Sequence, residues 1–442
     1  MLGSTSWSYK MPASGSVKPI APVTIGGTDI VFAQGVRAGN WLFFTGHEAT
    51  DFETGLAAPV IGQPGLPLHG LTRYRREGDV LMERLTRLVE SEGSDLRHAV
   101  RLDQYYPTWR AVDPYHHARR ARFGKGGIPP STSVVMKELL VKDAGIDVSM
   151  LAVMPGGDRT PRRADPKDVP VPPWSGFAPC MISGDYVFVA GQMANEDDKM
   201  AAVHPKASRP RQAMWGGTDI RLQTEFLITD RLEPAMRVGG SSLANAVKAQ
   251  VYLGNIEDLP DFLDVWNAYF AKTPCALTIV PTSSFGLADG IIEINLFGVR
   301  DDGRTKKQII EVDLPQAMRF GPAAVKAGDL LCLSGLVAAD GKGPIAHVGD
   351  AGGLGHLGVG AQRQMRYLLD AAAKVCEAAG TTLANVVRAQ HFHTNLADVY
   401  AAQRVWHERL PGVPIPFGAV GTPGPMPVPG TTILLDLWAY AP

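Results

Sequence analysis

Two carboxylates stand at matching places in apolar segments that alternate as β-strands do. In GIIEINLFGV the apolar side chains fall on one face of the expected strand and Glu293 falls on the other. In GIDVSMLAV, Asp147 has the same place. A carboxylate on the open face of a strand can orient or deprotonate a water molecule. The alternative for both is a structural carboxylate that pairs with a lysine or arginine.

A second set of reactive side chains lies in the segment TWRAVDPYHHARRARFG. It holds His116, His117, Arg119 and Arg120 within one expected helix. Histidine exchanges a proton near neutral pH, and arginine binds planar anions through two parallel hydrogen bonds. We expect His117 to transfer a proton, and His116, Arg119 and Arg120 to bind the substrate. Positive side chains at these positions would favour an anionic substrate. The alternative is an ordinary solvated basic helix face.

Other patterns that suggest metals or cofactors are incomplete. His391 and His393 share a face of an expected strand, as two metal ligands would, but no third ligand is suitably spaced. The four cysteines form no CxxC pair. No strand of a dinucleotide-binding unit leads into the glycine-rich stretch at 349–360. We therefore expect no metal and no cofactor.

Length and charge set wider limits. The chain has 442 residues, which at roughly 150 residues per domain predicts about three domains. Its 43 basic and 44 acidic residues nearly balance, so no overall field favours a nucleic acid. There is no apolar run of about 18 residues and no signal-peptide pattern at the start. We expect a cytoplasmic protein that binds neither nucleic acid nor a membrane.

The elements that must position these residues occur three times. Apolar strands end in a small residue and glycine in NWLFFTGHEATD, DYVFVAGQMANED and DLLCLSGLVAAD. Their glycines, Gly46, Gly191 and Gly335, are spaced about 145 residues apart. Each stretch is followed by an amphipathic helix, a strand, a second helix and two closing strands. The sequence thus predicts three β-β-α-β-α-β-β modules of α/β (α+β) type.

Composition sets the expected boundaries. The stretch 154–175 is rich in proline and charge and is expected to form no regular element, whereas IIEVDL in a second, shorter linker could add a strand. The expected divisions are an N-terminal arm (1–27), a first module (28–155), a Pro-rich linker (156–174), a second module (175–300), a second linker (301–316) and a third module (317–442).

These motifs resemble the RidA (YjgF-type, reactive intermediate deaminase) family. The resemblance rests on TGH, AGQ and SGL at the strand ends, on EGSDL, GGSSL and AGTTL at the helix ends, and on KAQVYL and IIEI. It covers about Phe32 to Val153, Phe177 to Val299 and Phe320 to Tyr440, and the second copy matches most closely.

Membership of that family would imply an architecture and a site. Family members form trimers around a central β-barrel with ligand clefts between subunits, so three tandem copies would make an intramolecular pseudo-trimer, with further association left open. Glu293 aligns with the family glutamate that holds the attacking water, Asp147 replaces it in the first copy, and Leu434 replaces it in the third. The expected cleft-floor residues that bind substrate are Thr45, Gly46, His47, Gly191, Gln192, Ser334 and Gly335.

The chain departs from the family at one important position. In the deaminating branch an arginine in the strand after the second helix clamps the substrate carboxylate. Here PPSTSVV, TPCALTIV and VPIPFGAV place Ser131, Ala276 and Pro416 at or near that position. This loss argues against the family's standard activity on 2-imino and 2-enamino acids.

Three functions remain open from the sequence. The leading one is a cofactor-independent hydrolase or deaminase acting on a small imine, enamine or amide-like metabolite in an interdomain cleft. The second is a non-enzymatic RidA-like protein that binds a small ligand or regulates. The third is a ring-opening or chorismatase-like hydrolase, whose repeated Ser-Lys pairs are not evident here.

Overall fold

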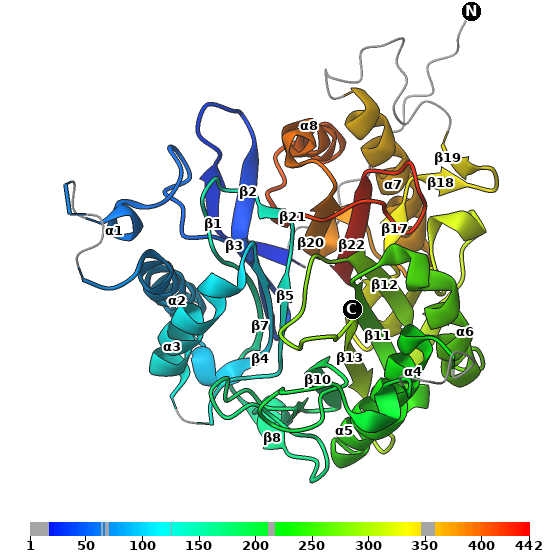
Figure 1. Cartoon of the computed structure of the whole chain (residues 1–442). Helices are drawn as coiled ribbons and strands as arrows, with labels where there is room; N and C mark the ends of the chain where they lie inside the picture. The colour runs from blue at the N-terminus through cyan, green and yellow to red at the C-terminus, as the bar shows by residue number, and fades with distance from the viewer. Residues whose placement is uncertain (1–16, 63–64, 67–69, 125, 211–216, 346–358) are drawn as a thin grey trace, which may run out of the picture.

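The structure is a computed structural model, and it describes residues 17–62, 65–66, 70–124, 126–210, 217–345 and 359–442. Residues 1–16 of the expected N-terminal arm and 349–358 of the glycine-rich stretch lie outside the described residues. We refer to residues 17–153, 162–299 and 307–440 as the first, second and third regions. The sheets face a shared interior and the helices lie on the outside (Figure 1).

The first region consists of β1 (Val17–Thr24), β2 (Val31–Ala38), β3 (Trp41–His47), α1 (Ala58–Ile61), α2 (Arg73–Ser91), β4 (Ala99–Tyr106), α3 (Val112–Phe123), β5 (Ser131–Val135), β6 (Glu138–Leu139) and β7 (Asp147–Val153).

The second region consists of β8 (Arg162–Ala164), β9 (Cys180–Ser183), β10 (Tyr186–Gln192), α4 (Asp219–Phe226), a π-helical turn (Leu227–Leu232), α5 (Glu233–Val238), β11 (Ala246–Leu253), α6 (Leu259–Phe270), β12 (Ala276–Pro281) and β13 (Ile292–Val299).

The third region consists of β14 (Lys307–Ile310), β15 (Ala324–Ala327), β16 (Leu330–Leu333), β17 (Leu336–Val337), β18 (Ala339–Asp340), β19 (Gly343–Pro344), α7 (Val359–Ala378), β20 (Val386–His393), α8 (Val399–Arg409), β21 (Ile415–Gly421) and β22 (Ile433–Tyr440).

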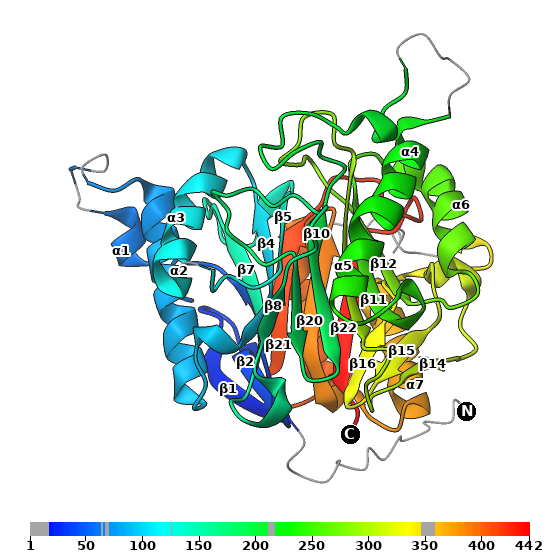
Figure 2. The same cartoon turned by 90° about the horizontal axis from the view of Figure 1, so that it is seen from below.

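The same strand order occurs in all three regions. It runs β1-β2-β3-β7-β4-β5, then β8-β9-β10-β13-β11-β12, then β14-β15-β16-β22-β20-β21. The last pair of each series is parallel, and the other pairs are antiparallel. Figure 2 shows the strands in the middle, with α2 and α3 on one flank and α4 and α6 on the other. The mixed α/β class expected from the sequence is confirmed.

One expectation about the linkers is wrong. The stretch 154–175 does contain a regular element, because β8 pairs antiparallel with β9 over Arg162, Arg163 and Ala164. An edge strand needs a hydrogen-bonding neighbour on one side only, so a charged segment can form one. In the second linker, β14 adds the extra strand that IIEVDL suggested, although it covers Lys307–Ile310.

The expected closed barrel is not found among the described residues. β2 and β6 both pair with β21, so the first and third regions share one sheet. The second region keeps its own six-stranded sheet and meets the first through single bridges, Ile128 with Phe177 and Val135 with Ser284. The interior is closed by side chains instead of a continuous ladder, with aromatic pairs such as Phe297 and Trp438 at 5.4 Å between ring centroids.

Buried charges join the three regions at the centre. In β4, β11 and β20 a register shift precedes Arg101, Lys248 and Arg388 respectively, so these cations have equivalent places. Lys248 Nζ lies 2.6 Å from Asp436 Oδ1, and neither side chain is exposed. Arg388 belongs to the third region, and its Nη1 lies 2.5 Å from Oδ2 of Asp103 in the first.

Amides and a third ion pair complete this network. Arg101 Nη2 lies 2.9 Å from Asp103 Oδ1 and donates to Asn295 Oδ1 at 3.0 Å. Gln250 Nε2 donates to Asp436 Oδ2 at 2.6 Å. Burial alone would raise the pKa of Asp103, but Arg101 and Arg388 hold it below its ordinary value. The carboxylate is therefore ionised at neutral pH.

No helix in the described part of the chain is both long and apolar enough to cross a bilayer.

Removing one partner of this network should destabilise the whole protein. In Asp436→Asn, Lys248 would remain buried without a counter-charge, so we expect the free energy of unfolding to fall by about 3–5 kcal/mol. Urea denaturation followed by circular dichroism measures the change. The control is Asp230→Asn, which breaks an exposed pair with Lys206 and should cost less than about 1 kcal/mol. Equal small losses in both variants would contradict the importance of the central network.

Candidate active site

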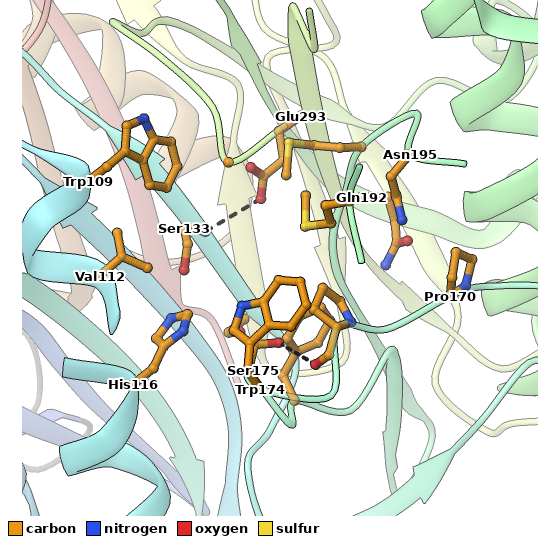
Figure 3. Close-up of a pocket in the computed structure, with 17 residues that line it drawn as sticks. Trp109, Val112, His116, Ser133, Pro170, Trp174, Ser175, Gln192, Asn195 and Glu293 are labelled. Atoms are coloured by element: carbon orange, nitrogen blue, oxygen red, sulfur yellow. Dashed lines mark hydrogen bonds between the residues drawn. The ribbon is translucent and has the colours of Figure 1, made fainter. Parts of the chain in front are cut away.

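A cavity of about 180 Å³ lies where the first and second regions meet, which we call the first cavity. Its walls come from α3 and β5 on one side and from β10 and β13 on the other, and the linker residues Pro170 and Trp174 also line it (Figure 3). The lining residues are Trp109, Val112, His116, Ser131, Ser133, Pro170, Pro172, Trp174, Ser175, Phe177, Gly191, Gln192, Met193, Asn195, Met200, Gly286 and Glu293.

Glu293 is the carboxylate of this cavity. Strand alternation turns it away from the helix-facing core, and its side chain is 3% exposed. Oε1 accepts a long hydrogen bond from the Ser133 backbone N–H at 3.4 Å, and Oε2 has no partner among the described residues. Burial raises the pKa of Glu293 to about 8. A partly unsatisfied, largely protonated carboxyl at neutral pH is able to donate a proton to a ligand.

Gly191 makes room for that carboxyl. A Cβ atom at this position would collide with Glu293 Oε1 and would approach Thr132 Oγ1 to 3.0 Å. The glycine of the AGQ motif therefore leaves the space that the Glu293 side chain of the same region occupies, beside Thr132 of the first region. Gln192, the next residue, is 4% exposed and also lines the cavity.

His116 is the second titratable group of the cavity. It is 6% exposed on α3, and neither ring nitrogen has a partner among the described residues. Burial, assisted by the charges of Arg119 and Arg120, lowers its pKa well below the ordinary value. The ring is therefore neutral and can accept a proton or donate a hydrogen bond. Figure 3 shows His116, Ser133 and Glu293 around the same space.

Arg119 lies behind the cavity wall. It is fully buried and donates to Gln104 Oε1 at 2.6 Å, to Ser131 Oγ at 3.3 Å and to the Ser175 carbonyl at 2.8 Å. Within the described residues it forms no ion pair with a carboxylate. Burial lowers its pKa. Arg119 thus holds the end of the linker through Ser175 and orients the Ser131 hydroxyl. Its guanidinium group places a positive charge close to the cavity.

Two tryptophans bound the cavity. Trp109 Nε1 donates to Ser284 Oγ at 3.0 Å, which fixes its ring across the boundary between the regions. Trp174 belongs to the linker and is 43% exposed. Pro170 and Pro172 complete the same wall. The cavity therefore offers flat apolar faces beside a small number of polar groups, as ligand sites commonly do.

Other residues predicted for the site lie elsewhere. His117 is exposed on α3, 3.6 Å from Asp113, and Arg120 is half-buried; neither lines the first cavity. Ser334 is fully buried and donates to the Pro322 carbonyl at 2.6 Å. Gly335 packs against Thr278, where an added Cβ would lie 3.0 Å from the threonine side chain.

The residues predicted in the first region divide between buried and accessible positions. Thr45 is buried, and Gly46 lines a second cavity between the first and third regions. His47 Nε2 lies 2.6 Å from the Gln34 carbonyl, and burial together with Arg84 lowers its pKa to about 4. Asp147 is fully buried with both oxygens unpartnered among the described residues. Burial raises its pKa to about 8, but it lines neither cavity.

The sequence missed the linker wall and Ser133. The Pro-rich stretch was interpreted only as a spacer, because nothing in its composition indicates which surface it crosses. Trp174 within a polar linker was the available signal. His391 and His393 do share a face of β20, and His391 Nε2 accepts from Trp406 Nε1 at 3.0 Å. The described residues contain no group of three side chains suited to a metal.

A family model for endoribonuclease L-PSP (Ribonuc_L-PSP) matches residues 312–420. The chain therefore contains one domain of this type, the type to which the RidA resemblance refers, within the third region. No curated protein sequence matches the chain.

Solved structures with similar folds include yeast Mmf1, at 20% identity and a TM-score of 0.26, covering 32% of this chain and 100% of that one. A Mycobacterium tuberculosis member of the YjgF/YER057c/UK114 family has 21% identity and a TM-score of 0.22, covering 28% and 86%. A chorismatase has 16% identity and a TM-score of 0.42, covering 63% and 80%. Likenesses this distant say nothing about activity.

The raised pKa of Glu293 predicts that the difference in stability between wild type and Glu293→Gln depends on pH. The folded protein keeps a proton that the unfolded chain releases near pH 4.5, so the folded state loses stability as pH rises from about 4.5 to about 8. Glu293→Gln removes this loss. Its free energy of unfolding, relative to wild type, should therefore rise between pH 5 and 9 by on the order of a few kcal/mol.

Thermal and urea unfolding across this pH range measure the difference. Glu83→Gln, at a half-exposed position on α2, is the matched control and should follow the wild-type profile. A Glu293→Gln profile parallel to wild type would contradict the buried, protonated carboxyl.

Proposed function

We propose that the chain is three RidA-like modules that form an intramolecular pseudo-trimer, and that its first cavity hydrolyses a small imine, enamine or amide-like metabolite without a cofactor. The repeated strand order supports the modular part of this proposal. So does a cyclic pattern of contacts, in which added Cβ atoms at Gly46, Gly191 and Gly335 would meet Gly418, Thr132 and Thr278 respectively. Each glycine thus packs on the neighbouring module.

The observation that carries the catalytic part is the state of Glu293. Its carboxyl lines the cavity, has an unpartnered oxygen, and keeps its proton to about pH 8. A C=N carbon becomes a better electrophile when its nitrogen is protonated. Glu293 is suited to that role, because a general acid works best when its pKa lies near the working pH.

The reaction balances with water alone. Glu293 gives its proton to the imine nitrogen, and water adds to the carbon while the resulting carboxylate takes a proton from that water. Protonation of the amine and collapse of the tetrahedral adduct release ammonia and leave a carbonyl product. The carboxyl of Glu293, which has regained its proton from water, can protonate the amine, and the neutral ring of His116 can donate a hydrogen bond to the adduct.

The lining constrains the substrate. No lysine or arginine is among the lining residues, so no cation can bind a substrate carboxylate directly, as the family arginine does. Arg119 can act on the substrate only through its hydrogen bond to Ser131. Trp109 and Trp174 favour a flat, weakly polar molecule. The lining does not favour the ribonuclease activity in the name of the matching family model, because RNA binding relies on cationic contacts to phosphate.

Glu293→Gln should abolish most turnover. We expect the rate to fall by about 100-fold or more, since a glutamine cannot exchange the proton. Ammonia release is measured on a panel of imines generated in situ by an amino-acid oxidase, together with enamines and primary amides, and melting shifts are recorded for the same compounds. Glu196→Gln, near the cavity but exposed, should retain activity. Melting shifts without any turnover in the wild type would instead support a binding protein.

Trp174→Ala tests the linker wall. Loss of one flat face should raise KM about tenfold for substrates with an aromatic group and leave kcat within about twofold, because the wall contributes to binding and not to proton transfer. Steady-state kinetics separates the two constants. Glu196→Gln serves again as the control. A fall in kcat at unchanged KM would exclude this role.

A further inference from the structure

A second, larger cavity of about 460 Å³ lies between the first and third regions. It is built from β2, the turn after β3, the segment after β6, the start of α8 and β21. Cavities of this size accommodate small organic ligands.

Aromatic rings form much of its wall. The rings of Phe32 and Phe52 lie 5.9 Å apart between centroids, and those of Phe32 and Phe417 lie 6.3 Å apart, both edge to face. Tyr400, which is 52% exposed, stands at the rim. These faces suit a flat apolar ring, because edge-to-face and offset contacts stabilise aromatic pairs.

One polar group in this wall lacks a partner. The side chain of Gln403 is 2% exposed, and its Nε2 makes no hydrogen bond with the described residues. An unpaired buried amide costs free energy, which a ligand oxygen would recover. By contrast, both oxygens of Glu48 are already used, because they accept from the backbone N–H groups of Leu140 and Val141 at 3.1 and 2.8 Å.

The charge of the wall disfavours ions. Burial, assisted by the charge of Asp147, raises the pKa of Glu48 well above its ordinary value, so this buried carboxyl offers no charge to pair with an ion. The other charged lining residues, Glu53 and Lys142, are exposed to solvent. The ligand that fits is therefore uncharged. It combines an aromatic ring with an amide or carbonyl group that meets Gln403.

The second cavity also lacks the chemistry of the first. Asp147 occupies the strand position that Glu293 has in the second region, since each stands opposite a tyrosine, Tyr105 or Tyr252. Yet Asp147 does not line the second cavity. Gly46 and Gly418 pack backbone to backbone at its floor, where a Cβ on either would collide. The lining carboxylate Glu53 is exposed to solvent, so the buried part of the cavity has no counterpart of Glu293.

We propose that the second cavity binds a small, uncharged aromatic amide or carbonyl compound without transforming it. Gln403 holds the oxygen of the ligand, and the phenylalanine rings hold its flat part. This site is separate from the first cavity. The proposal therefore does not depend on whether the first cavity converts a substrate.

Fluorine NMR on the full chain tests this site. The probes are 4-fluorobenzamide and 4-fluorotoluene, which share the ring but differ in the amide. A primary amide can pair with Gln403 in either orientation of the glutamine side chain. We expect 4-fluorobenzamide to bind at millimolar concentration and Gln403→Leu to weaken it about tenfold, while the weaker binding of 4-fluorotoluene stays unchanged.

Two further variants keep the result interpretable. Ala397→Trp, at an exposed position of the rim, should block the probe without touching Gln403, and it serves if Gln403→Leu does not fold. Trp174→Ala, in the wall of the first cavity, should leave the affinity unchanged. The proposal is overturned if wild type shows no binding, if the rim and glutamine variants bind normally, or if Trp174→Ala alone weakens the probe.

Discussion

The buried charge network at the centre constrains the rest of the structure. Lys248 of the second region is neutralised by Asp436 of the third, and Arg388 of the third is neutralised by Asp103 of the first. The buried cations of the second and third regions therefore need a carboxylate from a neighbouring region, because an uncompensated buried charge is strongly unfavourable, whereas Arg101 pairs with Asp103 of its own region. A purely apolar centre would be comparably stable, but it would not fix the positions of the three regions relative to one another. Fixed ion pairs hold the regions in one register, and both cavities lie along the boundaries that this register defines.

Within that frame, one residue position decides what each boundary can do. The last strand of each region presents Glu293, Asp147 or Leu434 at the same register. Glutamate is long enough to reach the first cavity, the shorter aspartate remains buried behind the wall of the second, and leucine has no carboxyl. Of these three residues, Glu293 alone lines one of the two cavities.

Much of the repeated fold could be predicted from local patterns. The spacing of Gly46, Gly191 and Gly335 and the alternation around Glu293 indicated the strands and the side on which the carboxyl stands. The open arrangement of the sheets in place of the expected closed barrel, the strand at Arg162–Ala164 and the linker wall could not be predicted from such patterns, because each depends on which distant segments meet. Arg119 illustrates this limit. The sequence marked it as a binding residue, whereas its contacts with Ser131 and Ser175 place it behind the wall.

Fusion into one chain is what allows the boundaries to differ. In an assembly of identical subunits a substitution appears at every boundary, but here the equivalent positions hold threonine twice, Thr132 and Thr278, and glycine once, Gly418. Thr278 occupies the space beside Gly335, and Thr132 lies next to the carboxyl of Glu293. Gly418 lets Gly46 approach closely backbone to backbone, and both glycines line the second cavity. A single position of the repeated fold thus differs between the boundary that holds the first cavity and the boundary that holds the second.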